Sequence, residues 1–183
     1  YFDGTGDYLS APNNTAFDQN SAFTFEFFDY LTSNGTTQAC FYTLTSGYLT
    51  ILRTSTGAYS LNQSFVGDLY ITSAFAFNAW HHVAVSYDGT NTRMYVDGVL
   101  QYTMSGGGVA CGAAPQIGAA AGGSVANGYI SNFRFVKSAL YTGSTLTIPT
   151  APLTAVSNTS LLLSCTNAGI LDNAMMNDLE TVG

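Results

Sequence analysis

The sequence predicts an all-β protein in which two antiparallel sheets pack face to face as a jelly-roll sandwich. Around a dozen short runs of strand-forming residues follow one another, with turn-forming residues between them. Two Asp-Gly pairs, Asp88-Gly89 and Asp97-Gly98, lie within residues 80–101, and the 12 Tyr and 12 Phe favour pleated strands. One sheet of so many strands would leave an aromatic face in water, so two packed sheets are expected.

The first third of the chain predicts a strand, a Gly-rich turn and a second strand within residues 1–13. A half-buried strand follows, because Phe23, Phe25 and Phe27 alternate with more polar neighbours. Asp29 lies on the same face as these three phenylalanines. The opposite face is formed by Thr24, Glu26 and Phe28. A meander of hairpins is expected within residues 40–45, 48–54, 58–64 and 68–75.

Residues 80–104 predict two consecutive hairpins. Val83 and Val85 share one face of the first strand, and Met94 and Val96 alternate in the return strand. Each Asp-Gly pair is expected to close a turn, because glycine tolerates a positive φ and Asp can hydrogen-bond the neighbouring backbone.

The second half continues the pattern with longer connections. Residues 105–114 predict a flexible Gly-rich loop, and residues 115–118 begin another strand. The next strand is predicted to place Tyr129, Ser131, Phe133 and Phe135 on one face, against Ile130, Asn132 and Arg134. Residues 147–156 carry prolines and predict an extended crossing connection, because proline has no N–H for a sheet ladder. Residues 160–165 predict a buried strand, and residues 168–180 leave room for a short helix.

Composition and charge limit the functions that the chain can have. The 183 residues fit a single domain, 1–183, and its start at Tyr1 suggests a processed chain or a segment of a longer protein. A net charge of −7 with four scattered cations argues against nucleic acid as a partner. No apolar run is long enough for membrane insertion. Cys40, Cys111 and Cys165 show no metal-ligand spacing and leave two alternatives, one disulfide or three buried thiols.

Four segments resemble the signature segments of laminin-G-like domains in the concanavalin A-like lectin/glucanase superfamily. They are "FDGTGDYLSAPN", "FTFEFFDYL", "WHHVAVSYDGTNTRMYVDGVL" and "GYISNFRFVKSALYTG". They occur in the family's order and cover nearly the whole chain. The ending "ALYTGSTLTIPTAPLTAV" is similar to the C-terminal part of such domains in virion proteins of marine bacteriophages.

Glucanases share this fold, so a catalytic role must be considered. A retaining glycosidase needs two carboxylates roughly 5 Å apart facing one groove. Glu26 and Asp29 are the only candidate pair, and their spacing on a strand turns them to opposite faces. The adjacent His81 and His82 face opposite ways for the same reason and cannot chelate one metal. We interpret Trp80 and His82 as structural, and we expect an exposed His81 ring to add little to stability. The prediction is no catalysis.

Two kinds of ligand stay open. The resemblance implies a Ca²⁺ ion at the rim of the sandwich, for which the matching segments supply Asp3, Asp7, Asp172 and Asn173. Turn formation explains these acidic residues equally well. For stacking on sugars, the candidates near turns are Tyr48, Tyr59, Tyr70 and Tyr102, which could also be ordinary strand aromatics. The sequence does not locate a sugar site.

Three functions remain as hypotheses. The first is a non-catalytic module that recognises a cell-surface glycan, or another surface, as part of a phage fibre, surface or decoration protein. The second is a self-associating structural protein of a virion or extracellular filament, since lysines that blunt sheet edges are nearly absent. The third, least favoured, is a glycoside hydrolase. The resemblance implies a place on the virion surface or outside the cell, with other virion proteins or a second copy as partners.

Overall fold

The computed structural model describes residues 1–43, 49–63, 68–108, 114–120, 123–166, 169–174 and 180–182. Tyr48 and Cys111 lie outside the described residues. Cys40 is buried and Cys165 is half-buried, and both are free thiols. In the described ranges, no helix is long and apolar enough to cross a membrane.

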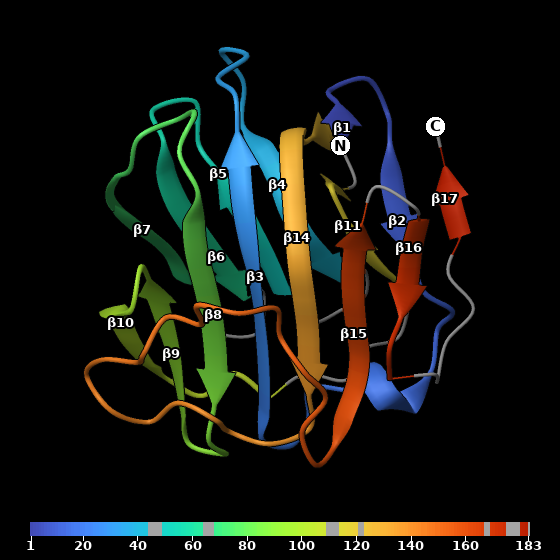
Figure 1. Ribbon diagram of the computed structural model, residues 1–183. Helices are drawn as coiled ribbons and strands as arrows, with labels where there is room; N and C mark the ends of the chain where they lie inside the picture. Colours follow the sequence, from blue (N-terminus) through green and yellow to red (C-terminus); the bar gives the residue numbers. More distant parts are fainter. Residues whose placement is uncertain are drawn as a thin grey trace.

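The predicted sandwich is confirmed: two antiparallel sheets face each other across an apolar core (Figure 1). In the described residues, the larger sheet has the order β10 (Val99–Ser105), β9 (Asn91–Val96), β8 (His81–Tyr87), β3 (Phe23–Leu31), β14 (Asn127–Val136), β15 (Thr159–Thr166) and β16 (Gly169–Asp172), with β1 (Phe2–Asp3) also paired to β14. The second sheet has the order β17 (Glu180–Val182), β2 (Tyr8–Ser10), β11 (Pro115–Ile117), β4 (Gln38–Thr43), β5 (Leu49–Arg53), β6 (Ala58–Gln63) and β7 (Asp68–Ala74).

Three small elements complete the fold. Strands β12 (Ala119–Ala120) and β13 (Ser124–Val125) pair with each other. A 3-10 helix at Thr15–Phe17 is capped by Asn14, whose Oδ1 accepts a hydrogen bond from the Ala16 N–H at 2.6 Å. The short helix expected within residues 168–180 is wrong for the described residues, because β16 and β17 occupy them.

The alternation predicted for β3 is confirmed and builds the core. Phe23, Phe25 and Phe27 are fully buried between the sheets, and the Phe25 ring lies 4.8 Å from Phe41 of the second sheet. Asp29 shares this inner face, because it contacts residues of β4, β5 and β6. Strand β3 therefore presents every second side chain to the core and the others to the outer face.

The alternation predicted for β14 is wrong in its first half. A β-bulge between Ser131 and Arg134 shifts the register with β3, and Asn132 there has a φ of +51°. One extra residue reverses the faces of the strand. Ile130 therefore lies in the core with Phe133, while Tyr129 is on the outer face with 47% of its surface exposed.

Both Asp-Gly turns are confirmed as glycines at positive φ, +97° at Gly89 and +80° at Gly98. At the second turn Asp97 also has a positive φ, of +49°. Two positive φ values are what a tight type I′ hairpin turn requires.

Residues 137–158, which join β14 to β15 and which we call the strap, cross the outer face of the larger sheet (Figure 1). The Thr24 hydroxyl donates to the Ser138 carbonyl and accepts from the Leu140 N–H, both at 2.8 Å. At the far side, the Leu146 N–H donates to the Gly98 carbonyl at 2.8 Å. The predicted crossing connection is thus confirmed, and it covers only part of this face.

Candidate functional site

The outer face of β3, β8 and β14 is divided by the strap into a covered part and an exposed part. The outward side chains of β3 follow in the order Thr24, Glu26, Phe28 and Tyr30. The strap contacts Thr24 and Glu26, whereas Phe28 and Tyr30 lie beyond it and are half-buried. The candidate site is the exposed part.

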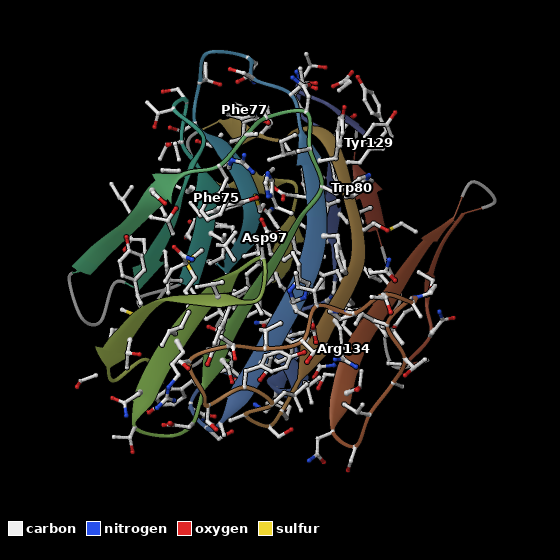
Figure 2. The ribbon with its side chains drawn as sticks, turned by 60° about the vertical axis from the view of Figure 1, so that its left-hand side comes forward. Phe75, Phe77, Trp80, Asp97, Tyr129 and Arg134 are labelled. Atoms are coloured by element: carbon white, nitrogen blue, oxygen red, sulfur yellow. The ribbon has the colours of Figure 1, made fainter. Side chains whose placement is uncertain are left out.

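A row of aromatic side chains occupies this exposed part. Trp80, Tyr129 and Tyr1 follow one another, and Tyr30 lies beside both Trp80 and Tyr129; we call these four side chains the aromatic row. Ring centroids are 5.7 Å apart for Tyr30 and Trp80, and 6.2 Å apart for Tyr30 and Tyr129. Tyr1 lies 5.1 Å from Tyr129. Figure 2 shows Trp80 and Tyr129 on the same face of the sheet, with Arg134 further down that face.

After the N-terminal residue Tyr1, Trp80 is the most exposed member of the aromatic row, with 52% of its surface accessible. The indole also packs against the rings of Tyr30 and Tyr129, so the interpretation of Trp80 as structural stays a prediction. A half-exposed indole beside the exposed Tyr129 and the half-buried Tyr30 forms a cluster, and clustered apolar surface marks a contact site more often than single residues do.

A groove of about 290 Å³ adjoins the aromatic row, between the sheet and the strap. Phe28 and Trp80 form its aromatic side, and Ser131 and Asn132 of the β14 bulge contribute hydroxyl and amide groups. The strap forms the opposite wall with residues 149–152. The Asn132 Oδ1 accepts a hydrogen bond from the Leu153 N–H at 3.2 Å, so the bulge also fixes the end of this wall.

Residues 75–80, which join β7 to β8 and carry Trp80, form a loop that buried side chains of the sandwich hold in place. The Arg53 guanidinium donates to the carbonyls of Phe75 and Ala76 at 3.1 and 2.8 Å. It lies 4.8 Å from the centre of the Phe77 ring, in a cation–π contact. Figure 2 shows Phe75 and Phe77 near the start of this loop. Buried contacts on both sides of the loop thus fix the position of the indole.

His81 also anchors this loop, so the condition of an exposed ring, under which it would add little to stability, is not met. Only 8% of His81 is exposed, its Nε2 lies 2.8 Å from the Ala76 carbonyl, and its Nδ1 lies 2.8 Å from an Asp97 carboxylate oxygen. His81 and His82 do face opposite ways, as predicted, because His82 points to the outer face and contacts Phe28.

Beneath the strap, Glu26 is the centre of a buried polar network. Its Oε1 accepts from Arg134, and its Oε2 accepts from the Tyr141 hydroxyl at 2.9 Å and lies 3.0 Å from His82 Nε2. Burial alone would raise the pKa of Glu26, but the His82 hydrogen bond and the Arg134 charge outweigh it and lower the pKa. Burial and the Glu26 charge raise the pKa of Tyr141. Glu26 is an ionised carboxylate with no exposed surface.

A second buried network lies between the sheets around Asp29. The Tyr59 hydroxyl donates to Asp29 Oδ1 at 2.6 Å, and the Arg53 guanidinium lies 3.5 Å from Oδ2. Burial raises the pKa of Asp29 to about 6, although Tyr59 and Arg53 both favour the charged form. Burial also raises the pKa values of Tyr59 and Cys40. Asp29 and Glu26 therefore sit on opposite sides of the sheet, as predicted.

Of the tyrosines predicted to bind sugar, two are described with their side chains, and neither is part of this site. Tyr59 is wrong as a stacking residue, because it is fully buried beside Asp29. Tyr102 packs half-buried against the core. Tyr48 lies outside the described residues, and Tyr70 is on β7 with its side chain outside them too.

The four predicted calcium ligands fall into two separate groups. The Asp3 N–H donates to Asp7 Oδ2 at 3.2 Å, and Asp172 Oδ1 accepts from the N–H groups of Leu162 and Ala174. Asp3 pairs with Asn127 of β14, and Asp172 pairs with Leu163, which in turn pairs with Phe133. Six residues along β14 separate the groups by roughly 20 Å. Asn173 lies beside Asp172, so one ion cannot bind all four, and calcium at either group stays a prediction.

Over the described ranges, no cluster of three or more His, Cys, Asp or Glu side chains is arranged to hold a metal ion. The site that the sequence missed is aromatic. One signal for it was present: the alternation in β3 places Phe28 and Tyr30 on the outer face, where apolar residues need an explanation. Tyr129 could not be found this way, because the bulge is not visible in the alternation.

Comparisons with known proteins agree with this architecture. A laminin-G family model, described as the concanavalin A-like lectin/glucanases superfamily, matches residues 3–143. A search of curated protein sequences finds no match to this chain. Among solved structures, a "putative carbohydrate binding protein" from Bacteroides ovatus is similar, with a TM-score of 0.70 and 18% identity over 98% of this chain. The chain spans 58% of that protein's length.

Two further structures share the fold. Domains LG4-5 of the mouse laminin alpha1 chain have a TM-score of 0.55 and 13% identity, with 81% of this chain and 44% of that chain covered. Domain 4 of AbnA, an extracellular arabinanase from Geobacillus stearothermophilus solved with arabinotriose, has a TM-score of 0.51 and 15% identity, with 68% and 64% covered. The family match extends over most of the chain, so this protein belongs to the concanavalin A-like lectin/glucanase superfamily.

Proposed function

We propose that this protein is a non-catalytic carbohydrate-recognition module whose ligand lies in the groove and over the aromatic row. The observation that carries the proposal is the aromatic row, in which Trp80 and Tyr129 are exposed, beside a groove with hydroxyl and amide groups. The structural relative from Bacteroides ovatus, named for carbohydrate binding, supports the same class of ligand.

The chemistry of the site matches that of a sugar ring. The C–H face of a pyranose or furanose packs on an aromatic ring, and its hydroxyls need hydrogen-bonding partners at the edge. Trp80 provides such a ring at the boundary between row and groove. Ser131, Asn132 and Thr150 provide polar groups within the groove. Because the Trp80 loop is anchored by Arg53 and His81, the ring is positioned before the ligand binds, which lowers the entropy cost of binding.

The absence of catalysis remains part of the proposal. A glycosidase acid must reach the glycosidic oxygen, and Glu26 is enclosed by Arg134, His82 and Tyr141 with no exposed surface. Its lowered pKa also disfavours the protonated form that a general acid needs. If the protein releases reducing sugar, and if Glu26→Gln abolishes that release, the hydrolase hypothesis replaces this one.

For the biological setting, we propose a surface-exposed position on a phage fibre or decoration protein, or another extracellular location. The support is the similarity of the C-terminal segment to phage virion proteins. That segment includes the strap, which forms one wall of the groove. Self-association as a structural protein is compatible with glycan binding, since a fibre can present binding modules on an oligomeric stem.

The test compares variants of the aromatic row on a glycan array and by titration calorimetry. Trp80→Ala and Tyr129→Ala should each weaken binding at least tenfold, because each removes a stacking surface worth about 1.4 kcal/mol or more. Trp80→Phe should retain part of the affinity. Val99→Ala, at a residue 53% exposed on β10, is the matched control and should bind as wild type. Equal binding by Trp80→Ala and wild type would reject this site.

A further inference from the structure

We infer that this site selects uncharged, extended glycans and rejects sulfated, uronate-containing or sialylated ones. This inference rests on the proposed function and adds to it the chemical class of the ligand. It depends on where the chain's positive charges are.

The sequence contains only four lysines and arginines, and the structure describes all of them. Arg53 is fully buried beside Asp29, and Arg93 is paired with Asp88. Lys137 donates to the Asp18 carbonyl. None of these three lines the groove.

Arg134 is the cation nearest in position, because it lies further down the same outer face, but each of its three nitrogens already donates to a protein oxygen. Its Nε and Nη2 donate to Glu26, and its Nη1 donates to the Thr154 carbonyl at 2.8 Å. Only 7% of its surface is exposed. The one imidazole on this face, His82, is buried against Glu26. A sulfate or carboxylate bound in the groove would therefore find no charged side chain there.

The groove itself is uncharged. Its lining consists of aromatic, proline, alanine, serine, threonine and asparagine side chains. The whole chain carries a net charge of −7, so an anionic ligand approaches against repulsion. A desolvated anion without a partner binds poorly, whereas the hydroxyls of a neutral sugar are satisfied by amide and hydroxyl groups.

The length of the aromatic row indicates a chain of sugars rather than a single one. Trp80 lines the groove and also contacts Tyr30 and Tyr129, and Tyr1 extends the row beyond Tyr129. The groove, Trp80, Tyr129 and Tyr1 follow one another, so a ligand of several sugars contacts more of this surface than a single sugar does. Affinity should thus increase with oligosaccharide length.

The experiment measures binding of the wild-type chain to two sets of oligosaccharides of equal length. The neutral set contains gluco-, manno-, xylo- and arabino-oligosaccharides, and the acidic set contains heparin-derived, galacturonate and sialylated ones. Neutral ligands should bind at least tenfold more tightly, and their affinity should stay constant between about 0.05 and 0.5 M salt, because no ion pair is available to be screened.

A charge variant makes the test specific to the groove. Thr150→Lys places a cation in the groove wall, and Thr142→Lys changes the net charge equally at an exposed strap residue outside the groove lining. Thr150→Lys should raise the affinity for acidic oligosaccharides several-fold, and Thr142→Lys should not. An identical change in both variants would overturn the inference.

The remaining outcomes separate the inference from the proposed function. Tight, salt-sensitive binding of acidic glycans that is lost in Trp80→Ala would overturn the inference and leave the carbohydrate site in place. If wild type binds neither set, the proposed function fails and the inference fails with it.

Discussion

Gly98 shows at the scale of one residue how the hairpin and the strap depend on each other. Its φ of +80° disfavours any side chain, and an added Cβ would lie 2.8 Å from the Leu146 carbonyl oxygen of the strap. Gly89 has a similar φ of +97°, but an added Cβ there has open space around it. Comparing the same substitution at the two glycines therefore distinguishes the cost of backbone strain from the cost of a steric clash.

Gly98→Val should be more destabilising than Gly89→Val. Both variants carry a strain of about 1–3 kcal/mol from the left-handed backbone, and only Gly98→Val also pushes against the strap. Urea unfolding of the two variants and wild type measures the difference. Equal losses of stability would mean that the strap moves away from the new side chain without a cost in free energy of unfolding.

Asp29 gives the fold a pH dependence of unusual sign. Its pKa is raised to about 6 in the folded state from 3.8, so between these values the folded protein holds a proton that the unfolded chain has lost. Stability from this group is therefore greatest at low pH, falls as pH rises from about 4 to about 6, and is level above that.

Asp29→Asn removes this titration. Across pH 4 to 6, the stability of wild type relative to Asp29→Asn should fall by an amount on the order of 1–3 kcal/mol. Glu26 acts in the opposite direction, because its lowered pKa makes its contribution disappear as pH falls, but it is present in both proteins and cancels. The measurement is urea unfolding at half-unit pH steps. A constant difference would show that the Arg53 charge keeps Asp29 ionised throughout.

The strap is the element whose removal would change the site most. Buried Glu26 joins β3, β14 and the strap through Arg134 and Tyr141. Glu26→Gln leaves Arg134 buried beside a neutral amide, so we expect a loss of about 3 kcal/mol, as for other broken buried pairs. Asp88→Asn breaks the more exposed pair with Arg93 and should cost under about 1 kcal/mol.

The same pair of variants tests whether the strap supports binding. Glu26→Gln should also weaken glycan affinity, because residues 149–152 of the strap form one wall of the groove. Asp88→Asn should leave the affinity unchanged. Chemical denaturation and calorimetric titration of each protein provide both numbers. Unchanged affinity in a destabilised Glu26→Gln protein would mean that the groove wall does not depend on this network.

Strands β3 and β14 also show which parts of the fold could be predicted from the sequence. The alternation of Phe23, Phe25 and Phe27 was enough to orient β3, because an uninterrupted strand keeps its period. In β14 the same reasoning failed at Asn132, where one bulged residue reversed the faces and moved Tyr129 outward. A bulge is set by tertiary packing and by a local positive φ, neither of which hydrophobic periodicity reports.

At the scale of the whole molecule, the sandwich was predictable because every level of the sequence agreed on it: composition, alternation and turn chemistry. The site was not, because it is assembled from segments that only the topology brings together. Trp80 precedes β8, Tyr30 lies near the end of β3 and Tyr129 lies near the start of β14. The alternation of β3, which places Phe28 and Tyr30 on the outer face, was one signal for it in the sequence.

The edges of the two sheets carry the last prediction, which concerns self-association. At the β10 edge the Leu100 N–H donates to the strap carbonyl of Ser144, and Val99 bridges Thr145, so this edge is partly covered. In the described part of the chain β7 pairs only with β6, and Ile71 on β7 is 49% exposed. An open edge strand with an exposed apolar residue and no lysine favours pairing with a second copy.

We therefore expect reversible self-association at micromolar concentrations through β7. Ile71→Lys should shift the protein to monomer in sedimentation velocity, whereas Val99→Lys, at the covered edge, should associate as wild type. A wild-type protein that stays strictly monomeric, or that Val99→Lys dissociates equally well, would contradict this assignment of the interface.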